Sequence, residues 1–147
     1  MQIYIDGDGC PVIKNTVKIA KSFNLPVTIV KNYNHTINDE YAQVVSVDNH
    51  KDSADYYISN MMQKKDLVVT QDYGLGAMAL ARGGYVITQN GKVINDKNVD
   101  LLLQRRHINR EMRNKRKKYA PKNKKRTEKL NQYYEQSLIQ LLHEIIN

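Results

Sequence analysis

Short apolar runs alternate with longer amphipathic segments over the first hundred residues of the chain. Mostly apolar runs rich in Val and Ile predict buried strands at 3–5, 27–30, 44–47 and 67–70. Apolar positions three and four residues apart predict helices after three of these runs: one from Pro11 to Phe23, one that contains Ala54, Ile58 and Met62, and one over 75–81. The segment 85–94 is typical of a hairpin that turns at Asn90-Gly91.

Strands that alternate with helices in this order form right-handed βαβ units and a mainly parallel sheet. We therefore expect an α/β fold with a mainly parallel sheet and a terminal hairpin. The chain divides into an α/β domain of residues 1–104 and a basic helical extension, residues 105–147, packed on that domain or appended to it.

Two helices are predicted in the C-terminal part. The first begins at Val99 as an apolar helix, becomes strongly basic, and is broken at Ala120-Pro121. Thr127 is a candidate cap for the second. The second helix has an apolar stripe that must cover either the same domain or a second copy of the chain in a homodimer: Leu130, Tyr134, Leu138, Leu141, Leu142 and Ile145.

The net charge of +8 is concentrated in one segment. Thirteen of the 23 lysines and arginines lie within residues 105–129 beside only two glutamates, whereas residues 1–104 carry ten basic and eleven acidic residues. A basic segment of this density favours a polyanionic partner such as nucleic acid, and a solvated face without a partner is the alternative. The candidate phosphate contacts are Arg105, Arg106, Arg110, Arg113 and Arg116.

The expected compartment is the cytoplasm. We detect no signal peptide and no apolar run of about 18 residues, so no membrane partner is expected. Cys10 is the single cysteine, which excludes an internal disulfide and fits a reducing compartment.

Aspartates follow three of the predicted strands at the point where each strand ends. Asp6 and Asp8 follow the first strand, Asp48 follows the third, and Asp72 follows the fourth after one glutamine. The carboxyl ends of parallel strands meet at one edge of a sheet, where ligands bind. These acids are therefore expected to converge, although Asp8 also suits a turn and Asp48 an ordinary strand end.

Two further aspartates lie at the start of the helix after the third strand. Asp55 lies beside its apolar face, and Asp52 is three residues earlier, where it also suits a helix cap. Converging carboxylates repel each other and are costly to bury, so either some are protonated or a cation lies among them. Oxygen donors, with the four histidines scattered along the chain, favour Mg²⁺ or Mn²⁺ over Zn²⁺.

The blocks IDGDGCPV, VDNHKDSADYYI and DLVVTQDYGLGAMALARGG, in this order, resemble the YaiI/YqxD family of bacterial proteins, itself similar to PIN-like nuclease domains. The resemblance covers most of the chain, from Ile3 through the arginine-rich helix. It implies a three-layer α/β/α PIN-like domain followed by basic C-terminal helices. Family members usually have alanine where this chain has Gly7 and Gly9.

In PIN-like domains, acids at the ends of the first and fourth strands and on an intervening helix bind a divalent metal. The matching positions give Asp6, Asp55 and Asp72 as metal ligands, and Asp8 joins them as a catalytic residue. Thr70 resembles the hydroxyl residue that often precedes the last acid by two positions, and Asp52 is a second supporting candidate.

The function expected from these features is metal-dependent hydrolysis of phosphodiester bonds, with RNA favoured over DNA. Bound metal would activate water, Asp8 or Asp52 would orient that water or bind a second ion, and the basic helix would hold phosphates. Three alternatives remain. The chain could be a non-catalytic nucleic-acid-binding protein with the same fold, or an interaction module that uses its C-terminal stripe. It could also be a haloacid-dehalogenase-like phosphatase with Asp6 as nucleophile and Asp8 as acid–base, although Cys10 then stands where that motif has threonine.

Overall fold

The computed structural model describes residues 1–32, 36–50, 53–105 and 125–146. A helical segment, residues 99–105, precedes the stretch 106–124, which lies outside the described residues. The other elements, in chain order, are β1 (Ile3–Asp6), α1 (Ile13–Ser22), β2 (Val27–Asn32), β3 (Gln43–Val47), α2 (Ser53–Met61), β4 (Leu67–Val69), α3 (Tyr73–Ala81), β5 (Tyr85–Ile87), β6 (Val93–Ile94) and α5 (Glu128–Ile146).

The strands form one sheet in the order β3-β2-β1-β4-β5-β6, in which only β6 is antiparallel to its neighbour. This confirms the predicted α/β fold with a mainly parallel sheet and a terminal hairpin. Strand β1 is central: Ile5 pairs with Ile29 of β2 on one side and with Val69 of β4 on the other. The end of β1 therefore lies between two parallel neighbours, where side chains that follow the strands can meet.

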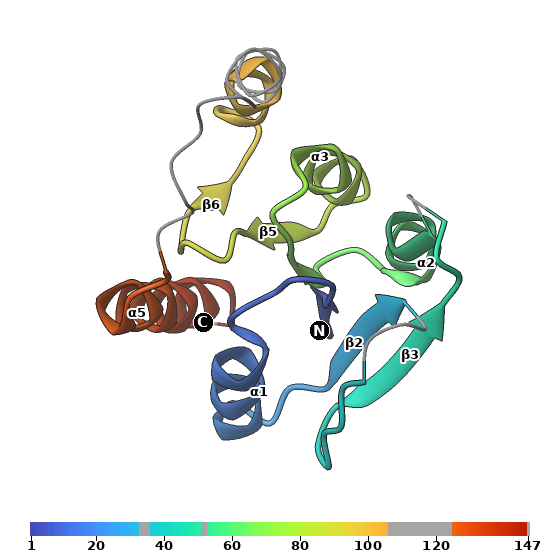
Figure 1. The fold of residues 1–147 in the computed structure, drawn as a ribbon. Coiled ribbons are helices and arrows are strands. Elements are labelled where there is room, and N and C mark those ends of the chain that lie inside the picture. The colour runs from blue at the N-terminus through green and yellow to red at the C-terminus, as the bar shows by residue number, and fades with distance from the viewer. Residues whose placement is uncertain (33–35, 51–52, 106–124, 147) are drawn as a thin grey trace, which may run out of the picture.

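Helices cover both faces of the sheet, which gives the three layers that the family resemblance implies (Figure 1). Alternate residues of each strand point to opposite faces. Ile3 and Ile5 pack in one core with α1 and α5, whereas Tyr4 packs in a second core with α2 and α3. Leu102 places the segment 99–105 against the second core.

Helix α5 completes the first core. Its stripe is buried at Tyr134, Leu138, Leu141 and Leu142, against the same cluster as α1 and the inner face of β1. The Tyr134 hydroxyl donates to Thr16 Oγ1 over 2.7 Å, and Thr16 Oγ1 in turn donates to the Val12 carbonyl of α1 over 2.7 Å. The stripe thus covers this chain's own domain, and the homodimer through α5 stays an untested prediction.

The start of α5 is fixed by two side chains. Thr127 caps the helix by accepting from the Leu130 N–H over 3.2 Å, which confirms the predicted cap. The Arg126 guanidinium donates to the Asn90 side chain over 3.0 Å, and it also donates to the Gln89 carbonyl and to the Asn131 side chain. Arg126 therefore attaches the start of α5 to the turn between β5 and β6.

The element ends differ slightly from those predicted. Strand β2 continues to Asn32 because β3 pairs with it as far as that residue. Strand β4 ends at Val69, its last residue paired with β1 and β5. Helix α1 begins at Ile13, not at Pro11, because residues 7–12 form the turn that leaves β1. Within the described ranges, none of the helices combines the length and the apolar character that crossing a bilayer requires.

Candidate carboxylate site at the carboxyl edge of the sheet

Asp6 and Asp72 are joined through one hydroxyl group. Asp6 is the last residue of β1 and is half-buried, and Thr70 follows β4 and is only 3% exposed. The Thr70 hydroxyl donates to Asp6 Oδ2 over 3.0 Å, and Thr70 Oγ1 accepts from the Asp72 backbone N–H over 3.0 Å. The parallel pairing of β1 with β4 brings these residues together, as expected for acids at equivalent strand ends.

Asp72 also begins helix α3. Its Oδ1 accepts from the backbone N–H groups of Gly74, over 2.8 Å, and Leu75, over 3.3 Å, which makes Asp72 the N-cap residue. A carboxylate at a helix N-terminus is stabilised by the helix dipole. The position of Asp72 is therefore set by the backbone before any ligand binds.

Asp8 lies on the turn after β1. Both of its carboxylate oxygens lie within hydrogen-bond distance of the Asn32 backbone N–H, at 3.1 and 3.2 Å, which ties the turn to the end of β2. Gly7 donates its N–H to the Val30 carbonyl over 2.8 Å, and a Cβ at Gly7 would lie 2.9 Å from Ile29 Cγ2. The turn thus runs so close to β2 that a Cβ at this position would force Ile29 or the neighbouring backbone to shift.

The three acids act on each other electrostatically. Burial raises the pKa of the Asp6 carboxyl above its ordinary value, the hydrogen bond from Thr70 lowers it, and the charges of Asp72 and Asp8 raise it again. The thiol of Cys10 has a raised pKa as well, first because of burial and also because of the Asp6 charge, while the Arg126 charge lowers it. Asp6 is therefore an acid that a bound cation or a proton would stabilise.

The contacts described for Asp6 do not include the remaining predicted acids. Asp55 is half-buried in the first turn of α2, and the charges that act on Asp6 are those of Asp72 and Asp8. In the part of the chain that the structure describes, no group of three His, Cys, Asp or Glu side chains is placed to hold a metal ion. Asp48 is exposed, and Asp52 lies outside the described residues.

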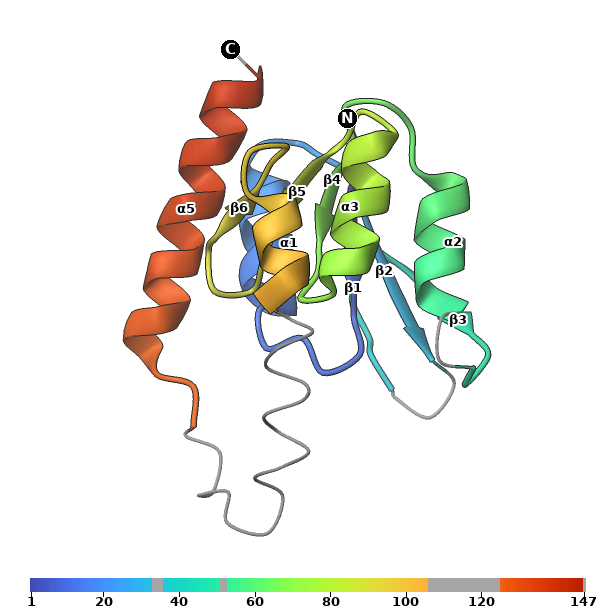
Figure 2. The same cartoon turned by 90° about the horizontal axis from the view of Figure 1, so that it is seen from above.

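The arginines predicted to hold phosphates are described only in part. Arg105 is exposed at the end of the segment 99–105. The others lie outside the described residues: Arg106, Arg110, Arg113 and Arg116. The segment 99–105 ends, and the chain leading into α5 begins, at the same edge of the molecule as the carboxyl ends of β1 and β2 (Figure 2).

The carboxylate group fits one class of metal better than others. Mg²⁺ and Mn²⁺ prefer oxygen ligands, and Mg²⁺ commonly keeps several waters while it binds one or two protein carboxylates. Asp6 and Asp72 supply a carboxylate pair of this kind, held in place by Thr70 and by the start of α3. The donor set therefore fits a partly hydrated Mg²⁺ or Mn²⁺ ion.

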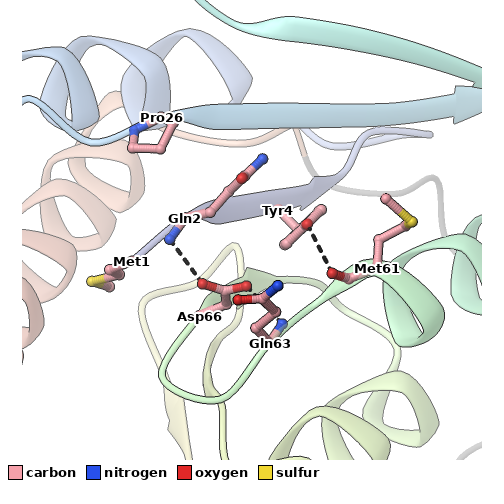
Figure 3. A pocket seen from close by; sticks show the side chains of 7 residues that line it. All are labelled: Met1, Gln2, Tyr4, Pro26, Met61, Gln63 and Asp66. Carbon is pink, nitrogen blue, oxygen red and sulfur yellow. Dashed lines mark hydrogen bonds between the residues drawn. The ribbon is translucent and has the colours of Figure 1, made fainter.

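A second concave region lies at the opposite edge of the sheet, where the strands begin (Figure 3). It has a volume of about 390 Å³ and contains Asp66, which is 7% exposed. Asp66 Oδ1 accepts from the Gln2 N–H over 2.9 Å, and Oδ2 accepts from the Gln63 N–H over 2.8 Å. Asp66 therefore joins the starts of β1 and β4, a structural role.

Sequence reasoning did not single out Asp66 or Arg126. An aspartate directly before the apolar run 67–69 signals a buried acid that needs partners. Arg126 was counted only as one charge of the basic segment, and its position next to the predicted cap Thr127 was the available signal.

The fold and the carboxylate group define a three-layer α/β domain with an acidic site at the carboxyl edge of its sheet. A family profile described as "Uncharacterized BCR, YaiI/YqxD family" matches residues 4–144, and the chain belongs to this family.

Curated relatives cover nearly the whole chain. It is 45% identical over 146 residues to a UPF0178 protein of Alkaliphilus oremlandii, which covers 99% of this chain and 94% of the relative. It is 41% identical to a UPF0178 protein of Exiguobacterium sibiricum, with 98% of both chains covered. A UPF0178 protein of Staphylococcus aureus is 38% identical, with 97% of this chain and 95% of the relative covered. No solved structure gives a significant match.

Proposed function

We propose that this protein is a divalent-metal-dependent nuclease that hydrolyses phosphodiester bonds, with RNA favoured over DNA. The observation that carries the proposal is the junction at the end of the central strand, where the Thr70 hydroxyl joins the Asp6 carboxylate to the backbone of Asp72. Asp8 lies close enough for its charge to act on Asp6. Negative charge gathered at the ligand-binding edge of a parallel sheet supports a cation-dependent reaction there.

Each residue of the group has a role in this reaction. Asp6 and Asp72 would hold the metal, and Asp55 is the third predicted ligand. Bound Mg²⁺ or Mn²⁺ would supply charge neutralisation at the phosphoryl oxygen and a lowered pKa for water. Thr70 fixes the orientation of the Asp6 carboxylate, and Asp8 would orient the attacking water, with Asp52 as the alternative for that role.

The basic segment provides the attraction that an acidic site lacks. Phosphodiester groups are repelled by carboxylates, so a nuclease of this kind needs cations on either side of the cleaved bond. The segment that contains Arg106, Arg110, Arg113 and Arg116 is joined on both sides to described chain at the carboxyl edge (Figure 2). This attachment favours contact between its arginines and the phosphates that flank Asp6.

One observation favours a second candidate function. Among the described residues, no three acidic, histidine or cysteine side chains are placed to hold a metal ion. This is the arrangement expected of a nucleic-acid-binding protein that has the fold but not the catalytic activity. Such a protein would bind nucleic acid in a salt-sensitive way and release no product with Mg²⁺ or Mn²⁺.

Cleavage of end-labelled single-stranded RNA and DNA, with Mg²⁺, Mn²⁺ or EDTA, tests the proposal. Asp6→Asn and Asp72→Asn are expected to reduce cleavage to background while binding stays intact or tightens, because each removes one negative charge. Asparagine also caps helices well, so Asp72→Asn retains the start of α3. The matched control is Asp96→Asn, an exposed acid after β6.

Cleavage that is unchanged in both variants would remove the site assignment. Salt-sensitive binding without product in either metal would leave the non-catalytic alternative in its place.

A further inference from the structure

A cavity of about 410 Å³ lies between the first turn of α1 and the segment 36–39 that follows β2. Pockets that bind small molecules usually measure about 300–1,000 Å³. Both walls are short pieces of chain that leave neighbouring strands at the carboxyl edge, since α1 follows β1 and the segment 36–39 follows β2. The cavity therefore belongs to the same edge of the sheet as the carboxylate group.

Two observations place this cavity beside the turn at Gly7. Cys10 lines it, and the Cys10 N–H donates to the Gly7 carbonyl over 3.4 Å. Ile37 also lines it, and its Cδ1 lies 3.6 Å from the position that a Cβ on Gly7 would occupy. Because Gly7 stands between Asp6 and Asp8 in the chain, the cavity lies beside the turn that links these two acids.

The lining combines apolar side chains with amides and one carboxylate. Ile13 and Ile37 supply apolar surface, and Asn15 and Asn38 supply donors and acceptors. Asp39 is fixed in orientation because its Oδ1 accepts from the N–H groups of Tyr41, over 2.8 Å, and Ala42, over 2.7 Å. Apolar surface for a ring, with polar groups for its edge, is the arrangement that recognises an unpaired nucleobase.

The charge of the α1 wall suits the phosphate of the same nucleotide. The N-cap residue of α1, Val12, offers no side-chain hydrogen bond, and the first turn carries no acid. The dipole of a helix attracts anions to its N-terminus, and Lys14 adds a positive side chain to this wall.

We propose that this cavity binds one unpaired nucleotide of the substrate, with the base against Ile13 and Ile37 and the phosphate at the start of α1. The inference rests on the proposed function. It adds that the nucleic-acid substrate is single-stranded where it passes the end of β1. Asn15, Asn38 and Asp39 read the edge of the base, and Lys14 binds the phosphate.

Titration of the ¹⁵N-labelled full chain, in EDTA, with the four nucleoside 5′-monophosphates and with inorganic phosphate tests this site without any cleavage. We expect nucleotide-induced shifts at Asn15 and Asn38, including their side-chain amides. Asn15→Ala and Asn38→Ala should each weaken nucleotide binding by about three- to tenfold, since each removes hydrogen bonds to the base. Asn60→Ala, an exposed position on α2, is the control and should leave binding unchanged.

Lys14→Ala and Lys21→Ala form a second matched pair, because both are exposed lysines of α1 and only Lys14 lines the cavity. Loss of nucleotide affinity in Lys14→Ala alone supports the phosphate assignment. Absence of shifts at the cavity up to several millimolar nucleotide overturns the proposal. So do equal shifts with inorganic phosphate and with nucleotide, which would show an anion site without base recognition.

Cleavage of single-stranded and fully paired RNA separates this proposal from the one on which it rests. Metal-dependent cleavage that Asp6→Asn abolishes, but that is equal on paired and unpaired strands, overturns the nucleotide site and leaves the nuclease. Nucleotide binding at the cavity without cleavage in any metal overturns the nuclease and leaves a single-strand-binding site.

Discussion

Each of the two edges of the sheet contains an aspartate that is at least half-buried, but the two carboxylates have different neighbours. At the amino edge, Asp66 receives two backbone N–H groups, one on each carboxylate oxygen, from Gln2 and Gln63. At the carboxyl edge, Asp6 receives the Thr70 hydroxyl and has Asp72 and Asp8 as charged neighbours. Burial is common to both acids, so burial alone does not mark a functional carboxylate. The neighbours of the carboxylate make the difference.

The direction of the parallel strands explains this difference. At the amino ends, the turn 63–66 and the start of β1 present N–H groups that an acid can satisfy. At the carboxyl ends, the charges of Asp72 and Asp8 act on Asp6, and Asp72 already uses its Oδ1 to cap α3. Asp66 therefore stabilises the amino edge. At the carboxyl edge, the burial of Asp6 and the repulsion from its charged neighbours destabilise the fold, and a bound cation or proton would reduce this repulsion.

The largest expected effect concerns a matched pair of isosteric variants. Asp66→Asn turns an amide donor toward one of the two backbone N–H groups, so we expect the free energy of unfolding to fall by about 2–3 kcal/mol. Asp6→Asn retains an acceptor for Thr70 and removes repulsion from Asp8 and Asp72, so the change should stay within about 1 kcal/mol. Urea unfolding of both variants measures the difference, and equal losses would contradict the contrast between the edges.

A second pair concerns the threonines of the two edges. Thr70→Val loses the hydroxyl that joins Asp6 to the Asp72 backbone and should cost about 1–2 kcal/mol of unfolding free energy. Thr28→Val, at the amino edge, loses only a bond from the Gln2 side chain and should cost less than about 1 kcal/mol. A greater loss in Thr28→Val, measured by the same urea unfolding, would show that the Asp6–Thr70–Asp72 junction contributes little to stability.

The pH dependence of stability gives a smaller effect with a definite sign. The pKa of Asp6 is higher in the folded protein than its ordinary value of 3.8. Between pH 3.8 and the folded-state pKa, the folded protein therefore holds a proton that the unfolded chain has released. The contribution is fully present below pH 3.8 and is lost as the pH rises through the folded-state pKa. In metal-free buffer, wild type should therefore lose stability relative to Asp6→Asn over this interval. Parallel pH curves for the two proteins would show that Asp6 has an ordinary pKa.

The smallest effect is expected at a third acid, Glu135 of α5. It pairs with Lys18 of α1 over 2.6 Å; the Glu135 side chain is 18% exposed, but the Lys18 side chain is 71% exposed. Solvent screens such a pair, so Lys18→Ala should lower the unfolding free energy by about 0.5 kcal/mol or less. Urea unfolding in low and high salt checks this, since the small loss should shrink further as salt is added. A loss of unfolding free energy comparable to that of Asp66→Asn would mean that solvent exposure does not determine how much each acid contributes to stability.

The sequence predicted the features that follow from periodicity and strand order. Val and Ile runs located β1 to β4, and the rule that parallel strands end at one edge predicted that Asp6 and Asp72 would lie at the same edge. Thr70 was indicated only by the family resemblance, and it bonds both residues. The sequence also predicted the apolar stripe of α5. It did not predict which surface the stripe covers, because periodicity identifies an apolar face but not the surface that packs against it.

Other features depend on how separate loops are placed, which no local pattern encodes. The Arg126 clamp requires the turn at Gln89 and Asn90 to lie beside the start of α5, although these residues are more than 30 positions apart. The cavity beside Cys10 requires the segment 36–39 to return over Gly7. The part that Asp55 has in the site stays a prediction, because the described contacts of Asp6 do not include it.

The burial of Tyr134 against Thr16 has a consequence for the order in which the chain is synthesised. One face of the central strands is fully covered only after α5 has been made, because α1 covers only part of it, so the nascent domain exposes an apolar surface until late in translation. The arginine-rich segment precedes α5 in the chain, so its positive charge is present before this core is closed.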